Sequence, residues 1–353
     1  MSKQLSSESQ KQSALVICPG RGTYNKDELG YLQRHHSDKF HILDTIDSER
    51  ASKGQVTVTE LDQMQNYQMR VHTAGENAAS LIYACSFADF LAIDSNQYDI
   101  VAVTGNSMGW YIALAVAQAL TQPNAAKLIN TMGSMMAGGT VGGQAIYPIV
   151  DDNWQVSAER VAQVNSAIAE INTHPEARIY ESIRLGGYIV FGGNYAALAL
   201  LEEYLPKLDE RYPMRLFNHA AFHTPLLDEV SEQALQLLPS DMFQAPKIPL
   251  IDGRGHIWQP YSTDTAALHR YTLGHQVNRT YDFSAAVEVA IKEFAPDKVI
   301  VLGPGATLGG AIAQTFIQHQ WHNLQSKSDF IAQQKDQPLL LAMGLAEQRQ
   351  RVV

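Results

Sequence analysis

A short segment of the form Gly-x-Ser-x-Gly, residues 105–109 (Gly-Asn-Ser-Met-Gly), constrains the fold of this chain more than any other feature. An apolar run, residues 98–103, precedes it, and a helix-like run, residues 110–117, follows it. A strand, a sharp turn and a helix in this order form a nucleophile elbow, in which glycines on both sides of the serine let the strand and the helix approach each other. The sequence therefore predicts that the Ser107 hydroxyl stands exposed at the start of a helix.

The predicted surroundings of Ser107 suit attack on a carbonyl carbon. At the start of a helix the main-chain N–H of Met108 can face a developing oxyanion, and the helix dipole supports the negative charge. A serine hydroxyl also needs a base, and the segment Ala-Phe-His-Thr-Pro-Leu supplies His223 beside a predicted helix start. Two other interpretations stay open: a glycine-rich turn whose serine is incidental, and a different base among the 12 histidines.

Composition narrows the class of protein. The 353 residues carry a formal net charge of -10, which argues against binding nucleic acid through a basic surface. No apolar run reaches the ~20 residues that cross a bilayer, and the polar start is unlike a signal peptide, so we expect a cytoplasmic protein without membrane contact. Cys18 and Cys85 have no metal-ligand spacing, so we expect neither a disulfide nor a bound metal.

Strand-like and helix-like runs alternate along the chain, which predicts an α/β fold with a mainly parallel sheet. The main strand candidates, each followed by a turn residue, are residues 14–18, 100–104, 247–251 and 298–302. A glycine-rich stretch at 138–143 then opens a different pattern, with strands predicted at 144–150 and 187–191 and helices at 157–171 and 195–208. This pattern predicts a small α+β subdomain inserted into a larger domain.

The predicted organisation has four parts. Residues 1–12 form a disordered leader, 13–137 and 213–325 the large domain, 138–212 the small subdomain, and 326–353 a polar tail with a terminal helix at 339–347. His35, His36 and His256 lie in polar loops and are predicted at the surface.

Four motifs follow one another in an order that is found in one enzyme family. They are Cys-Pro-Gly-Arg-Gly-Thr-Tyr (18–24), Gly-Asn-Ser-Met-Gly (105–109), Ala-Phe-His-Thr-Pro-Leu (221–226) and Gly-Pro-Gly (303–305). From about residue 13 to about residue 318 the chain resembles the malonyl-CoA:acyl-carrier-protein transacylases, which include the acyltransferase domains of fatty-acid and polyketide synthases. The resemblance implies an α/β-hydrolase-like large domain with an inserted ferredoxin-like subdomain.

The resemblance also implies a mechanism. Ser107 would attack the thioester of acyl-CoA, with His223 as base and then acid, and the acyl group would pass to the phosphopantetheine thiol of an acyl carrier protein. No further cofactor is implied, and we expect a monomer. The main-chain N–H groups of Arg21 and Met108 would form the oxyanion hole. Asp282 aligns where the family uses a main-chain carbonyl to orient the histidine, so its carboxylate is a candidate for that role.

Three residues depart from the family pattern. Asn106 replaces the histidine before the serine and still offers hydrogen bonds, and Arg21 replaces a glutamine whose main-chain N–H it retains. Met132 stands where the family has the arginine that pairs with the malonyl carboxylate, and burying a carboxylate without a cation is costly. Either the pocket takes an acyl group without a carboxylate, with Met132 as an apolar wall, or Arg21 or Arg184 supplies the cation.

Three functions therefore stay open. Acyl transfer to a carrier protein in fatty-acid or polyketide synthesis is the leading hypothesis. A hydrolase on the same scaffold would release the acyl group to water from the same acyl-enzyme. A catalytically weak scaffolding homologue is the third, which the three departures allow and which the retention of Ser107 and His223 opposes.

Overall fold

The computed structural model describes residues 11–135 and 141–353, so the predicted leader lies outside the described residues up to position 10. A six-stranded sheet, ordered β11-β10-β1-β2-β7-β8, forms the centre of the larger part of the molecule. Its strands are β1 (Gln12–Cys18), β2 (Tyr98–Gly105), β7 (Leu250–Ile251), β8 (Ile257–Trp258), β10 (Lys298–Val301) and β11 (Leu340–Ala342). Only the pair β7 and β8 is antiparallel among these described strands. The predicted α/β class with a mainly parallel sheet is confirmed.

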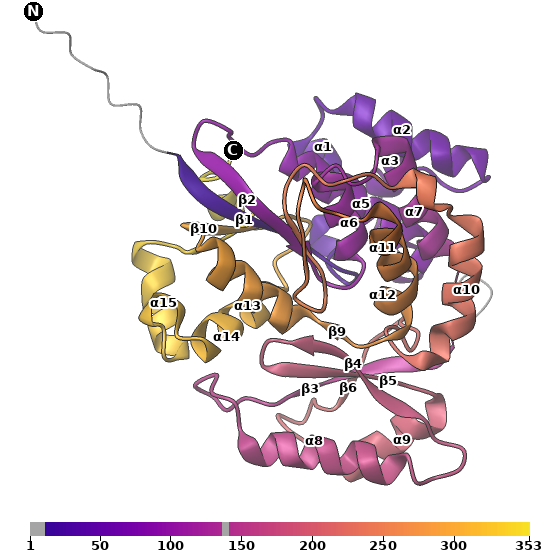
Figure 1. Ribbon diagram of the computed structural model, residues 1–353, viewed down its shortest axis with the longest axis vertical. Coiled ribbons are helices and arrows are strands. Elements are labelled where there is room, and N and C mark those ends of the chain that lie inside the picture. Colours follow the sequence, from indigo (N-terminus) through magenta and orange to yellow (C-terminus); the bar gives the residue numbers. More distant parts are fainter. Residues whose placement is uncertain (1–10, 136–140) are drawn as a thin grey trace, which may run out of the picture.

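Helices cover both faces of this sheet (Figure 1). On one face lie α5 (Gly75–Phe90), α6 (Gly109–Val116) and α7 (Gln122–Ser134), and on the other lie α13 (Phe283–Phe294) and α14 (Gly309–Gln318). This division follows from right-handed crossovers, because the chain moves one way across the sheet from β1 to β7 and returns from β7 to β11. Helix α5 is buried on almost all sides, as expected for a helix without a polar face.

Further helices complete the large part of the molecule. They are α1 (Tyr31–His35), α2 (Phe40–Ser52), α3 (Val58–Asp62), α4 (Met69–His72), α10 (Asp228–Leu237), α11 (Thr265–Arg270), α12 (Gln276–Asn278), α15 (Lys327–Asp336) and α16 (Ala346–Arg349). A π-helical turn, η4 (Tyr271–His275), joins α11 to α12.

A second, five-stranded sheet has its own apolar cluster and the order β6-β3-β5-β4-β9. Its strands are β3 (Gly143–Pro148), β4 (Ile179–Leu185), β5 (Tyr188–Gly193), β6 (Met214–Arg215) and β9 (Tyr281–Asp282), and α8 (Ala158–Ile171) and α9 (Tyr195–Tyr204) cover its outer face (Figure 1). Strand β4 was not predicted, because its apolar residues alternate with Glu181 and Arg184. Since β6 and β9 lie outside residues 138–212, the predicted subdomain does not form this sheet alone.

The C-terminal segment differs from the polar tail that the sequence predicts. Leu340–Ala342 is strand β11, which is buried and pairs in parallel with β10 at the edge of the central sheet. Helix α16 begins only at Ala346, so the helix predicted over 339–347 is wrong for most of its length. A short apolar run fits a buried strand as well as a helix, and its hydrophobic periodicity does not distinguish the two.

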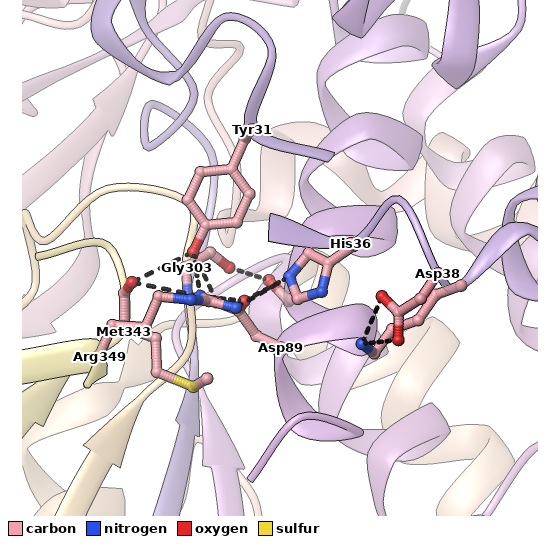
Figure 2. Close-up of polar contacts among 9 residues, drawn as sticks. Tyr31, His36, Asp38, Asp89, Gly303, Met343 and Arg349 are labelled. Carbon is pink, nitrogen blue, oxygen red and sulfur yellow. Dashed lines mark hydrogen bonds and ion pairs between the residues drawn. The ribbon is translucent and has the colours of Figure 1, made fainter. Parts of the chain in front are cut away.

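A buried polar cluster fastens this segment to the core (Figure 2). The Asp89 carboxylate of α5 accepts hydrogen bonds from Arg349 (2.6 Å), His36 (2.7 Å), Tyr31 (2.8 Å) and the N–H of Gly303 (2.7 Å). Burial alone raises the pKa of Asp89, but the hydrogen bond from His36 and the charge of Arg349 lower it overall. His36 is fully buried, so its predicted surface position is wrong: its partner is a carboxylate remote in sequence.

Candidate active site

The turn that carries Ser107 is as tight as the sequence predicts. Ser107 has a φ of 56°, in the left-handed region, between the end of β2 and the start of α6. A Cβ atom on Gly105 would lie 2.2 Å from the carbonyl of Gly109, and one on Gly109 would lie 2.2 Å from the carbonyl oxygen of Cys18. Only glycine fits such contacts, so the predicted role of the two glycines is confirmed.

Ser107, His223 and Gln276 form one hydrogen-bonded chain. The Ser107 Oγ lies 2.7 Å from His223 Nε2, and His223 Nδ1 lies 2.5 Å from the main-chain oxygen of Gln276. A carbonyl oxygen accepts only, so Nδ1 carries the ring proton and Nε2 has a free lone pair. The Ser107 hydroxyl therefore donates to Nε2, which is the arrangement that a general base needs.

The environment keeps His223 neutral. Burial lowers its pKa to about 4, the hydrogen bond to the Gln276 carbonyl opposes this shift, and the nearby His275 adds to it. The side chain is 4% exposed, so water scarcely stabilises the charged form.

Gln276 was missed by the sequence analysis, although it holds the site together at three points. Besides its carbonyl, its side-chain Oε1 accepts from the Tyr111 hydroxyl (2.7 Å), and its Nε2 donates to the carbonyl of Ser107 (3.0 Å). It follows the π-helical turn η4, and such turns occur often at functional sites. A main-chain carbonyl leaves no signature in a single sequence, so no pattern marks this residue.

A pocket of about 620 Å³, measured with its open mouth, lies over Ser107 and His223. Its walls are mostly apolar and come from α5, α7, α10 and the segment around Gln276. Among the residues that line it are Arg21, Met108, Ile129, Met132, Phe222 and Val230. Ser107 thus lies at an apolar cavity, and Arg21 supplies a cation to its wall.

Met132 lines the pocket as predicted, and the two predicted main-chain donors also lie at it. Arg21 and Met108 line the cavity beside Ser107, and their N–H groups donate to no residue in the described part of the chain. Neither N–H is therefore committed to another acceptor there.

Comparison with known proteins gives distant relatives and close structural matches. No protein-family model matches the chain. It is 22% identical over 241 residues to a malonyl CoA-acyl carrier protein transacylase of Buchnera aphidicola, a match covering 68% of this chain and 74% of the relative. It is 25% identical over 155 residues to a non-reducing polyketide synthase of Penicillium aethiopicum, which covers 43% of this chain and 8% of the synthase.

Solved structures match over almost the whole chain. The malonyl-CoA:acyl carrier protein transacylase of Xanthomonas oryzae pv. oryzae superposes with a TM-score of 0.72 at 19% identity, covering 97% of this chain and 98% of that one. The chain has the malonyl-CoA:acyl carrier protein transacylase fold. A malonyl-transacylase solved with its type II polyketide-synthase acyl carrier protein shares this transacylase fold, with a TM-score of 0.68, 18% identity and coverage of 86% and 93%.

Three residues that were predicted at the site lie outside the pocket of this transacylase fold. Asn106 is buried beside Gly20 and does not line the pocket. Arg184 is 53% exposed, pairs with Glu181 and Asp282 and does not line the pocket, so it does not supply the cation of this pocket. The Asp282 carboxylate binds Arg184 and the N–H of Ala285 at the start of α13, while His223 is oriented by a carbonyl; the predicted orienting role of Asp282 is wrong.

Residues 11–135 and 141–353 contain neither a metal-ion cluster nor a membrane-spanning helix. No group of three or more His, Cys, Asp or Glu side chains is placed to hold a metal ion. Among the described helices, none combines the length and the apolar character that a membrane span requires.

Proposed function

We propose that the protein transfers a short acyl group, malonyl or a related one, from CoA to an acyl carrier protein through an ester on Ser107. The observation that carries the proposal is the chain from Ser107 through His223 to the Gln276 carbonyl, placed at an apolar pocket. The transacylase fold supports it, as do the relatives named malonyl transacylases.

The proposed first half-reaction forms the ester. His223 Nε2 takes the proton of the Ser107 hydroxyl while Oγ attacks the thioester carbonyl, and the main-chain N–H groups of Arg21 and Met108 stabilise the oxyanion. Collapse of the intermediate breaks the carbon–sulfur bond, and the imidazolium of His223 returns the proton to the CoA sulfur. The same steps in reverse, with the phosphopantetheine thiol as attacking group, deliver the acyl group to the carrier protein.

These residues supply nucleophile, base and oxyanion donors from the chain itself, so we propose a reaction without a further cofactor. The carrier protein as acceptor rests on the relatives, among them the transacylase solved in complex with one. A cytoplasmic location and a monomeric state stay predictions, which cell fractionation and size-exclusion chromatography with light scattering test.

Intact-mass measurement after mixing with acyl-CoAs, with and without a carrier protein, tests the function. We expect an acyl adduct on the wild-type protein that disappears when holo carrier protein is added, with the acyl mass then found on the carrier. Ser107→Ala removes the attacking oxygen and should abolish the adduct. An adduct that persists in Ser107→Ala contradicts the proposal.

The same measurement separates the two alternatives. An adduct that decays at one rate with and without carrier protein, and leaves the carrier unmodified, indicates a hydrolase. A wild-type protein that forms no adduct with any acyl-CoA indicates a scaffolding homologue.

A further inference from the structure

Arg21 brings a positive charge to the acyl pocket without a carboxylate partner from the described residues. Its Nη2 donates to the carbonyl oxygens of Thr73 and Asn218, both at 2.9 Å. Its Nε and Nη1 donate to no acceptor there, and it forms no ion pair in that part of the chain. Two neutral carbonyls position the guanidinium but leave its net charge uncompensated.

Two other buried arginines of the described chain differ from Arg21 in their hydrogen bonds and ion pairs. The fully buried Arg50 uses all three of its nitrogens on oxygen acceptors, including the side chains of Asn77 and Asn130. Arg349 pairs with Asp89. Arg21 keeps part of its hydrogen-bonding fork free, and it does so on the wall of the pocket that contains Ser107.

Burial and the charge of Arg21 shift the pKa values of two groups. Burial lowers the pKa of Arg21 to about 10. At His219, burial and then the charge of Arg21, with a smaller effect of His223, lower the pKa to about 3. An anion bound at Arg21 would compensate the buried charge and reduce its contribution at His219, because a paired guanidinium is more easily buried than an isolated one.

We propose that Arg21 binds a terminal carboxylate of the acyl group, so that this pocket selects acyl groups that carry one. The inference rests on the proposed function, because it places the carboxylate on the thioester substrate of Ser107. The guanidinium stands 5.4 Å from the centre of the Phe222 ring, which together with the two carbonyls restricts its plane. A planar fork held in this way suits the two oxygens of a carboxylate.

The loop after β1 thus contributes the cation of the pocket, whereas α7 contributes the apolar Met132. The main-chain N–H of Arg21 and its side chain then act on one substrate, the first on the thioester oxygen and the second on the carboxylate. The walls around them, with Ile129 and Val230, accept the carbon chain between these two groups.

The rate of Ser107 acylation by malonyl-, acetyl- and butyryl-CoA tests the inference. Arg21→Gln keeps the main-chain N–H and removes the charge. We expect the wild type to prefer malonyl-CoA, and Arg21→Gln to lower kcat/KM for malonyl-CoA by about tenfold to a hundredfold, the range for a hydrogen bond to a charged group. The rates with acetyl- and butyryl-CoA should change less than about threefold. Arg184→Gln, the same change outside the pocket, should alter none of the three.

Two results overturn the inference. One is an unchanged malonyl rate in Arg21→Gln. The other is an equal fall for all three thioesters, which indicates that Arg21 binds a part of CoA common to them or supports the loop. Arg21→Lys is the control for a folding defect. It keeps the charge without the planar guanidinium and should retain part of the malonyl preference. Thermal unfolding compares the stability of both variants with that of the wild type.

A binding measurement separates failure of the inference from failure of the proposed function. Calorimetry with Ser107→Ala and with the double variant Ser107→Ala/Arg21→Gln needs no turnover. We expect malonyl-CoA to bind at least tenfold more tightly than acetyl-CoA in the first variant, and about equally in the second. If malonyl-CoA and acetyl-CoA bind equally in both variants, the inference is overturned. If the wild type forms no adduct but Ser107→Ala still binds malonyl-CoA more tightly, only the acyl transfer is overturned.

Discussion

His223 depends on a carbonyl rather than a carboxylate, and this determines how it titrates. A carboxylate beside Nδ1 stabilises an imidazolium strongly, whereas the Gln276 carbonyl brings only a partial charge. Burial is therefore the larger influence, and the pKa of His223 falls to about 4. The base is neutral, and ready to accept the Ser107 proton, over the whole range in which the protein is expected to work.

The pH dependence of acylation follows from this shift. Since His223 must be neutral to accept a proton, kcat/KM for adduct formation should be level from about pH 8 to pH 5 and should fall tenfold per pH unit below about 4. Stopped-flow or quenched-flow mass measurement of the Ser107 adduct checks this. An inflection near 6.5 would show that the histidine titrates as it does in water.

Acid unfolding could also lower the rate in that measurement, and the pKa shift of His223 gives the direction in which stability changes with pH. The pKa of His223 is lower in the folded protein than in the unfolded chain, so the unfolded state binds more protons between about pH 4 and 6.5. Stability is therefore present above the unfolded pKa and is lost as pH falls towards 4. Thermal unfolding at each pH identifies the range in which the rates refer to folded protein.

At the residue scale, the reactive side chains could be predicted from the sequence. The orientation of a side chain and the role of a main-chain carbonyl could not. Ser107 and His223 carry their reactivity in the side chain, and the motifs around them are specific in order. The Gln276 carbonyl could belong to any residue type. Asp282 and Arg184 have suitable charges for a site, yet they face each other at the surface, and no sequence pattern reports where a side chain points.

At the scale of elements, the elbow is tight because the ends of β1 and β2 and the start of α6 pack closely around Gly105 and Gly109. Gly109→Ala should destabilise the fold by about 1–3 kcal/mol or more, since its Cβ would overlap the Cys18 carbonyl. Gly310→Ala is the matched control in α14: apart from neighbouring atoms of its own helix, no atom lies within 4 Å of its Cβ position, and alanine is the better helix former. Chemical denaturation should show it unchanged or stabilised by about 0.5–1 kcal/mol. Equal losses in both variants would contradict the packing argument.

Element prediction succeeded where burial is continuous. Strands β1, β2 and β10 contain runs of Val, Ile, Leu and Ala that are mostly buried in a parallel sheet, which the sequence displays directly. Strand β4 mixes apolar and charged residues, and β11 is a three-residue apolar run in a polar region. Both are specified by the strands beside them more than by their own composition.

At the scale of the whole molecule, the Asp89 cluster joins α5, the loop at Gly303 and the last helix (Figure 2). Arg349→Met leaves the buried carboxylate without its cation and should cost about 3–5 kcal/mol of unfolding free energy. Arg351→Met, an exposed neighbour, should change it by less than about 0.5 kcal/mol. Denaturant titration compares the two.

The cause of that loss is checked by a second change. Asp89→Asn in the Arg349→Met background removes the uncompensated charge and should recover part of the stability. If the double variant is no more stable than Arg349→Met alone, lost packing rather than the unpaired carboxylate explains the effect.

The position of β1 has a consequence for how the protein is made. This first strand lies between β2 and β10, and the carbonyl of Thr23 in the loop that follows it lies against Gly305. While a ribosome is still translating the middle of the chain, one edge of β1 has no partner, and the loop with Arg21 lacks its contact with Gly305. The nucleophile elbow can therefore form before its oxyanion loop has all of its contacts, so the site around Ser107 is completed only when synthesis has passed β10 and Gly305.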